Sequence, residues 1–130
     1  MKKNLLKVGF ASVDITPPMG TSVEGYFIDR NADGVLDNIE VNAISLNVLD
    51  KTVLLLSMDN CEIRANILSE YRQAISEKTG VPFDAVFIHT THTHTGPSIK
   101  QSEDKLINEY RKFALDKCVK VSELAIADLK

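Results

Sequence analysis

The three histidines of the chain, His89, His92 and His94, fall within six residues of one another. Threonines separate them, and Gly96 and Pro97 follow, so the segment is polar and turns soon after the last histidine. Imidazole is a frequent ligand for zinc and similar metals, and it also transfers protons near neutral pH. A polar surface turn can hold a histidine, but three gathered directly after an apolar run favour a metal or catalytic site.

The spacing of these histidines limits how they can act together. In an extended segment, side chains two residues apart point the same way, so His92 and His94 are expected to face one pocket. His89 should point to the opposite side unless the chain turns. We predict a metal ligand at His92 and an acid, a base or a substrate contact at His94. A catalytic zinc site has about three protein ligands plus a water, and this segment does not supply the third.

An acidic residue, Asp59, directly follows the apolar run at residues 52–58. One interpretation is that its carboxylate orients a ligating histidine, as carboxylates around metal sites often do. The other is that Asp59 or Asn60 caps the helix expected to follow. The residue pattern alone leaves both interpretations open.

Residues 29–40 match the EF-hand calcium loop in full, with acidic or amide side chains at its first, third and fifth positions, glycine at the sixth and Glu40 at the twelfth. An EF-hand needs a helix on each side. Prolines and glycines precede this loop and a β-like segment follows it. Helices around the loop would favour a non-catalytic calcium-binding module, which is the alternative function, whereas a strand after it would favour the metal-dependent enzyme.

Hydrophobic patterning divides the chain into strands, loops and helices. The expected elements are a strand at residues 8–15, a loop at 21–38, a strand at 39–49 with a bulge or change of face, a hairpin turn at 50–51, a strand at 52–58 buried on both faces, a helix at 63–79 with apolar residues every four positions, a strand at 85–88, and a long helix whose N-cap is Ser102.

This order, β-loop-β-β-α-β-α, predicts an α/β fold with a mixed sheet in one domain over residues 1–130. A right-handed crossover makes the strands that end near Asp59 and His89 parallel. Their carboxyl ends then share one edge of the sheet, where ligands bind in open α/β folds. Asp59 and the segment from His92 to His94 are therefore expected side by side.

Composition narrows the classes of partner and compartment. The net charge of −3, with five Phe, three Tyr and no Trp, offers no basic or stacking surface for nucleic acid. Cys61 and Cys118 stand in unrelated contexts, so we expect two buried, reduced thiols. Lys7 interrupts the opening apolar stretch, and no run has transmembrane length, so a cytoplasmic location is predicted.

Several segments resemble, in the same order, the N-terminal region of the neutral (non-lysosomal) ceramidase family and its bacterial relatives. The likeness extends over roughly the first hundred residues. It is carried by the glycine-containing strand and Asp-Ile-Thr turn at residues 8–17, the Gly-Tyr loop at 25–37, the Ser-Met-Asp at 57–59 and, most specifically, Thr-His-Thr-His-Thr-Gly-Pro at 91–97. The last is close to the family's Thr-His-Thr-His-Ser-Gly-Pro signature, with Thr95 where the family usually has Ser.

The resemblance implies a zinc site that hydrolyses the amide bond of ceramide or of another lipid-like or small-molecule amide. It makes His92 a zinc ligand, and it places His94 near the substrate, with Asp59 as the second predicted catalytic residue. The family takes a further histidine, a glutamate and a tyrosine from far downstream, and nothing after Pro97 matches them. The chain is therefore expected to be the N-terminal portion of a larger ceramidase-like domain. We expect it to bind zinc weakly and to be inactive alone, until a downstream segment or a partner chain completes the site.

Overall fold

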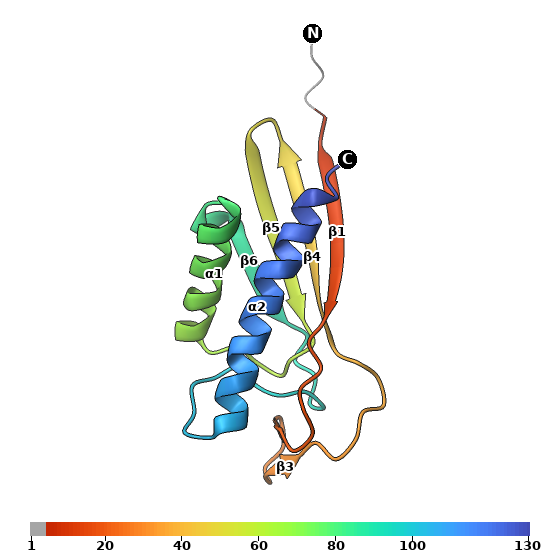
Figure 1. Ribbon diagram of the computed structural model, residues 1–130, viewed down its shortest axis with the longest axis vertical. Helices are drawn as coiled ribbons and strands as arrows, with labels where there is room; N and C mark the ends of the chain where they lie inside the picture. The colour runs from red at the N-terminus through yellow and green to blue at the C-terminus, as the bar shows by residue number, and fades with distance from the viewer. Residues whose placement is uncertain (1–4) are drawn as a thin grey trace.

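The computed structural model describes residues 5–130, and they form a four-stranded sheet in the order β1-β4-β5-β6, two helices and a small two-stranded sheet, β2-β3 (Figure 1). This confirms the α/β class, the mixed sheet and the predicted order of the main elements. Their bounds are β1 (Lys7–Asp14), β2 (Ser22–Val23), β3 (Arg30–Asn31), β4 (Glu40–Val48), β5 (Lys51–Met58), α1 (Ala65–Thr79), the 3-10 turn η1 (Phe83–Ala85), β6 (Val86–Thr90) and α2 (Lys105–Ala127).

The central unit β5-α1-β6 places two strand ends at one edge of the sheet. β1, β4 and β5 run antiparallel in turn, while β6 runs parallel to β5, and Met58 pairs with Thr90 at their carboxyl ends. Beyond those ends, the Thr91 amide donates to the Met58 carbonyl at 2.9 Å. The segments after β5 and β6 therefore emerge together, at the lower end of the sheet in Figure 1, as the preferred crossover predicts.

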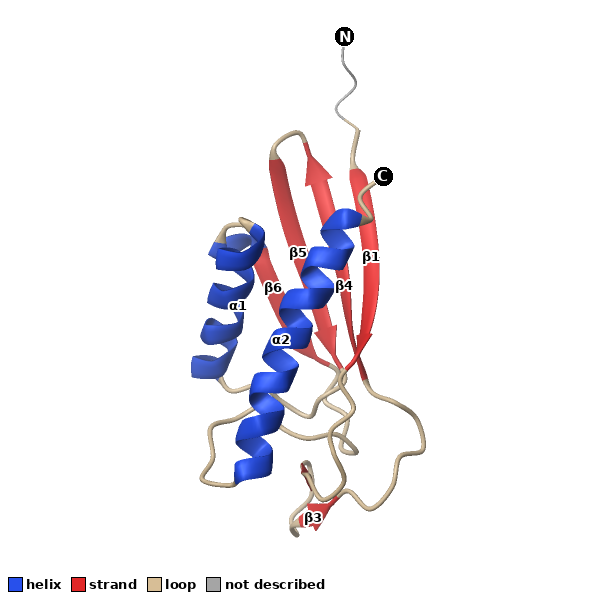
Figure 2. Ribbon diagram, in the orientation of Figure 1, coloured by secondary structure: helices blue, strands red, loops and turns tan. Residues whose placement is uncertain are grey.

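The core lies between the sheet and the two helices, which both cover the same face (Figure 2). From α1, the buried side chains are Ile67, Tyr71 and Ile75, which recur every four residues on the helix. Alternate residues of β5 face the helices, and α2 packs over β1 and β4 as well as α1. The helices thus hold β5 and β6 in place by packing on one face of the sheet. The site lies at the ends of these two strands.

The opposite face of the sheet is open within residues 5–130, so the prediction that β5 is buried on both faces is wrong. Leu55 is 36% exposed, and its neighbours in the same cross-strand row, Phe10 and Phe87, are 57% and 56% exposed. A continuous apolar run is compatible with one covered face or two. Here both helices lie on one side, so every second side chain of β5 stays uncovered.

Two details of the strands differ from the expected pattern. β4 keeps unbroken pairing with β1 and β5, so the expected bulge is absent from it. The hairpin turn is formed by Leu49 and Asp50, one residue earlier than predicted, because Val48 already pairs with Lys51. Leu49 takes the left-handed φ of 58° that a two-residue hairpin turn of this kind requires.

Both helices begin later than predicted. α1 starts at Ala65, so neither Asp59 nor Asn60 caps it, and Ile63 instead forms an isolated bridge with Ile99. α2 is capped by Asp104, whose carboxylate accepts from two amides of the first turn, rather than by Ser102. No helix between residues 5 and 130 combines the length and the apolar character that a membrane crossing requires.

Candidate metal centre

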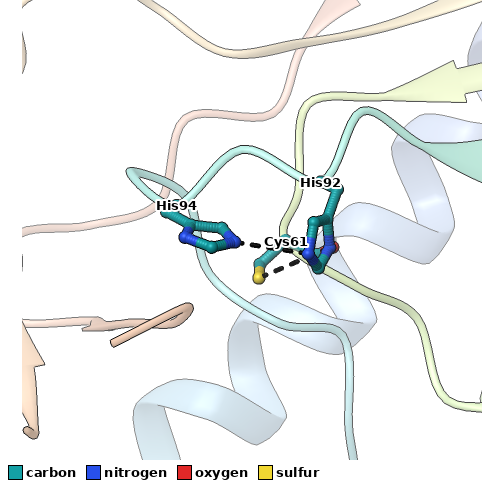
Figure 3. A group of neighbouring side chains, drawn as sticks. All are labelled: Cys61, His92 and His94. Atoms are coloured by element: carbon teal, nitrogen blue, oxygen red, sulfur yellow. Dashed lines mark hydrogen bonds between the residues drawn. The ribbon is translucent and has the colours of Figure 1, made fainter. Parts of the chain in front are cut away.

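The rings of His92 and His94 converge just beyond the end of β6, with their Nε2 atoms 3.3 Å apart (Figure 3). The expectation that both face one place is confirmed. The backbone conformation that brings the two rings together differs from the expected one, because the segment is bent rather than extended. His92 has a left-handed φ of 61°, and a turn follows at residues 94–96. The bend, not strand alternation, brings the two rings together.

A hydrogen bond to the backbone sets the orientation of the His92 ring. Its Nδ1 lies 2.8 Å from the carbonyl oxygen of Cys61, so an Nδ1–H donates to that oxygen. The free lone pair is then on Nε2, the atom that faces His94. Metal-ligating histidines commonly have such a partner on the second nitrogen. In this chain the partner is the Cys61 carbonyl.

Cys61 also brings its thiol to the two rings. One ligand atom from each of Cys61, His92 and His94 lies within 4.8 Å of the others, and the Cys61 Sγ is 4.0 Å from His92 Nδ1. Between residues 5 and 130, this is the only group of three or more His, Cys, Asp or Glu side chains close enough to share an ion. Sequence reasoning missed it by treating Cys61 as an ordinary buried thiol. The available signal was its place just after β5, at the predicted site edge.

Burial is the main influence on the Cys61 thiol. The residue is 4% exposed, and desolvation raises the thiol pKa above its usual value. The charges of Glu62 and Glu24 raise this pKa further, while the Ser98 hydroxyl acts in the opposite direction. The thiol is therefore harder to ionise than an ordinary exposed cysteine.

His89 stands apart from the cluster. It is exposed on β6, beside the Phe87 ring on the open face of the sheet, with ring centroids 6.0 Å apart. The prediction that it points away from His92 is confirmed. His89 is therefore an internal reference for the behaviour of a histidine outside the centre.

Asp59 contacts the histidine turn through its backbone. Its carboxylate accepts from the Glu40 amide at 3.1 Å, and it has no hydrogen bond to either His92 or His94. A Cβ placed on Gly96 would lie 2.8 Å from the Asp59 carbonyl oxygen, so this close approach requires glycine. Asp59 thus lies at the same edge as the histidines, as predicted, but it does not orient their rings.

The loop from β2 to β3 covers His94. A Cβ on Gly25 would lie 2.4 Å from His94 Cγ, and Gly25 has a φ of 99°, so glycine is needed there on both counts. The Tyr26 ring meets His94 edge-on at 5.9 Å between centroids. Arg30 donates to the His94 carbonyl at 2.7 Å and stacks over Tyr26. These contacts hold both the ring and the backbone of His94 in place.

A buried polar network anchors the turn that carries His92 and His94. The Asn60 amide donates to the Pro97 carbonyl at 3.2 Å and to the Tyr110 hydroxyl at 3.0 Å. The Tyr110 hydroxyl in turn donates to the Ile15 carbonyl at 2.8 Å. The Cys61 amide donates to Pro97 as well, at 3.2 Å. Helix α2, the end of β1 and both site segments are thereby joined.

Residues 29–40 do not have the EF-hand setting. β3 lies within the segment and β4 follows it, which by the criterion above favours the enzyme over the calcium module. Their carboxylates form no group close enough to share an ion. Instead, Arg30 supports His94, and several of the loop residues line a cavity of about 1000 Å³ together with Asp59, Thr93 and Thr95.

Comparison with solved structures shows which known fold the chain has. No protein-family model matches the sequence, and no curated protein matches it. Among solved structures, the chain has the fold of part of a larger ceramidase domain. It is similar to neutral ceramidase from Pseudomonas aeruginosa, with a TM-score of 0.82 and 20% identity, over 96% of this chain and 22% of that chain. A ceramidase complexed with C2 gives a TM-score of 0.79, also at 20% identity over 96% of this chain and 22% of that one.

These likenesses confirm the ceramidase resemblance at the level of the fold. The chain spans about a fifth of the length of the two ceramidases, since 22% of each is covered. The structural match covers 96% of this chain, and the segments that carried the resemblance in the sequence lie at residues 8–17, 25–37, 57–59 and 91–97. The structural match therefore includes the edge of the sheet at which the histidines lie.

Proposed function

We propose that this chain carries the zinc-binding segment of an amide hydrolase similar to neutral ceramidase. One observation carries the proposal: two histidine Nε2 atoms lie 3.3 Å apart at the carboxyl edge of a sheet whose fold matches neutral ceramidase with a TM-score of 0.82. Strands rather than helices adjoin residues 29–40, which argues against the calcium-binding module.

The donor geometry fits a zinc ion. Two nitrogens bound tetrahedrally at about 2.0–2.1 Å are separated by roughly 3.3–3.4 Å. The separation of 3.3 Å between the two Nε2 atoms matches this value. His92 has the tautomer a ligand needs, because its Nδ1–H is held by the Cys61 carbonyl. We therefore propose His92 as a zinc ligand and His94 as its partner at the same ion.

When bound, zinc would polarise the carbonyl of the amide substrate and lower the pKa of a bound water. The residues of the chain hold the two histidine rings in place for the ion. The Cys61 carbonyl holds the His92 ring, while Gly25 and Arg30 hold His94 in place. We propose Asp59 as a positioning residue, because its carboxylate fastens β4 to the segment that lies against Gly96. Preorganisation of this kind lowers the cost of reaching the transition state.

The neighbouring cavity supports an amide substrate with an apolar part. It is about 1000 Å³ in volume and reaches Thr93, which lies between the two histidines. Its apolar lining residues are Pro17, Met19, Val23, Ala32, Val35, Leu36, Ile39 and Pro97. The lining also includes threonines and acidic residues, which can bind polar groups. A lipid-like amide fits this mixture better than a purely polar one.

The test uses the protein with whatever segment or partner accompanies it naturally. The gene is tagged at its own locus, and the purified product is assayed for zinc content and for release of fatty acid from a short-chain N-acylsphingosine. We expect about one zinc per protein and zinc-dependent hydrolysis. His92→Ala should reduce both about a hundredfold or more, and His89→Ala should leave both intact. Natural material that holds no zinc, or hydrolyses no N-acyl substrate when it is zinc-loaded, would overturn the proposal.

A further inference from the structure

The guanidinium of Arg30 is a positive charge in the wall of the cavity of about 1000 Å³. None of the ion pairs formed between residues 5 and 130 involves Arg30. Of its N–H groups, Nη2 donates to the His94 carbonyl, while Nε is buried and has no hydrogen-bond partner among those residues. An arginine has five N–H donors, so the side chain keeps both its charge and several donors for a further group.

Two contacts hold this guanidinium in place. Its Cζ lies 3.6 Å from the centre of the Tyr26 ring, and its Nη2 lies 2.7 Å from the His94 carbonyl oxygen. A stacked and hydrogen-bonded guanidinium loses less conformational freedom on binding a ligand than a free arginine side chain does. Arg30 is therefore preorganised, and it directly adjoins one of the two histidines that we propose to hold zinc.

The hydroxyls of Thr93 and Thr95 add further donors. Both threonines line the same cavity, on either side of the residue to which Arg30 is bonded. Their Oγ1 atoms are 2.8 Å apart, so one hydroxyl donates to the other. The hydroxyl that accepts keeps its own hydrogen for a ligand. A guanidinium with a neighbouring hydroxyl is a donor set that suits a carboxylate, because charge-assisted hydrogen bonds are the strong ones.

Three aspartates, Asp33, Asp37 and Asp59, also line the cavity. None of them forms an ion pair with Arg30, and the Asp59 carboxylate already accepts from the Glu40 amide at 3.1 Å. Like charges repel, so an anionic group on a ligand is favourable in this cavity only where it contacts Arg30 directly. The same aspartates make a cationic ligand the rival interpretation.

We propose that Arg30, together with the Thr93 and Thr95 hydroxyls, binds a carboxylate on the amine part of the substrate, so that the site prefers N-acyl amino acids to amides whose amine part is uncharged. This inference rests on the proposed function, because it names the substrate class of the same site. The apolar residues of the lining would contact the acyl chain. A site built for a charged group discriminates against the analogue that lacks it, since its own polar groups are then left unpaired.

The experiment measures binding of four probes to the purified chain by isothermal titration. The probes are N-hexanoylglycine, its uncharged amide N-hexanoylglycinamide, the cationic N-aminoethyl hexanamide, and hexanoate, which represents the released acid. A chelator keeps the chain free of metal, so that no carboxylate binds through zinc. The variants are Arg30→Met and the charge-matched control Lys112→Met, at an exposed position of α2 outside the cavity lining. Circular dichroism verifies that each variant is folded.

We expect the unaltered chain and Lys112→Met to bind N-hexanoylglycine about tenfold more tightly than the uncharged amide, and the other two probes more weakly than N-hexanoylglycine. Arg30→Met should bind N-hexanoylglycine and the amide equally. Loss of the support that Arg30 gives to His94 would weaken binding of both probes alike, so the ratio of the two affinities isolates the contact with the carboxylate.

Equal affinities for N-hexanoylglycine and its amide in the unaltered chain would overturn the inference, and this comparison needs no variant. Tightest binding of the cationic probe, or hexanoate bound as tightly as N-hexanoylglycine, would overturn it too, as would an unchanged preference in a folded Arg30→Met. The proposed function fails separately. A preference for the carboxylate with no amide hydrolysis in the natural material would refute the hydrolase alone, whereas zinc-dependent hydrolysis without the preference would refute the role of Arg30 alone.

Discussion

Two segments of this chain carry patterns typical of metal sites, and the structure treats them in opposite ways. Residues 29–40 satisfy every position of the twelve-residue calcium loop, while the turn at residues 91–97 supplies only two ligands from its sequence. Yet the calcium-like loop brings no three ligand side chains together. The histidine turn, joined by Cys61, forms the metal-ligand cluster of the described residues.

The difference lies in what anchors each segment. The histidine turn is fastened by Thr91 and His92 amides to carbonyls of the neighbouring segment, at 2.9 and 3.1 Å, and by the buried Asn60–Tyr110 network. The loop at residues 29–40 lacks flanking helices, and Leu36 near its tip is fully exposed. A metal site needs ligands that rigid elements point toward one another, so a complete sequence pattern without its flanking helices counts for less than an incomplete one at the ends of two paired strands.

Among the variants that test the difference between the two segments, His92→Ala should have the largest effect. It removes the ligand whose tautomer is fixed by Cys61, and we expect zinc affinity to fall about a hundredfold or more. Isothermal titration of zinc into the purified chain measures it. His89→Ala serves as the control, because His89 lies outside the cluster. Equal losses in the two variants would mean that the histidines bind zinc without a defined site.

Tyr110→Phe tests whether the buried network is what stabilises the histidine turn. The change leaves the Ile15 carbonyl and the Asn60 amide short of a partner, so the free energy of unfolding should fall by about 1–3 kcal/mol. Urea denaturation gives the value. Tyr26→Phe, at an exposed position, should change stability by less than about 0.5 kcal/mol. If Tyr110→Phe leaves the free energy of unfolding unchanged, the buried network does not stabilise the histidine turn.

Gly25→Ala tests the cover over His94. The added Cβ would meet the His94 ring at 2.4 Å, and the φ of 99° disfavours alanine as well. The ring must move, so zinc affinity should fall about tenfold. Gly34→Ala is the matched control, since a Cβ there meets nothing within 4 Å. Similar affinities for the two glycine variants would show that the β2–β3 loop does not position His94.

The smallest expected effect is that of calcium. Because a ligand stabilises only as far as it binds the native state, millimolar calcium should leave the melting temperature unchanged, while zinc should raise it. Differential scanning fluorimetry compares the two ions on the unaltered chain and on Asp33→Ala. A rise of several degrees in calcium that disappears in Asp33→Ala would restore residues 29–40 as a calcium site.

Much of the fold was predictable because it depends on local patterns and on handedness. The parallel pairing of β5 with β6 follows from the crossover rule, and this pairing alone places Asp59 and His92 at one edge. The number of covered faces was not predictable, since the apolar run containing Leu55 reads the same with one helical layer or two. The shift of the α2 cap from Ser102 to Asp104 is of the size by which helix ends commonly vary.

The site was predictable in part. Clustering of histidines after a buried strand identified His92 and His94, although a bend at His92 rather than an extended backbone brings them together. Cys61 was missed because its neighbours are set by how the segment after β5 packs against the turn after β6. Such a contact joins residues about thirty positions apart, between Cys61 and His92, and leaves no periodic trace in the sequence.

The most direct test of the central claim follows the three histidine rings by nitrogen-15 NMR during a zinc titration. We expect the signals of Nε2 of His92 and of His94 to shift together and to saturate at one equivalent of zinc. The His92 Nδ1 should remain protonated through its bond to the Cys61 carbonyl, and His89 should not change. If instead all three rings shift gradually without saturation, or if His92 binds through Nδ1, the centre described here is contradicted.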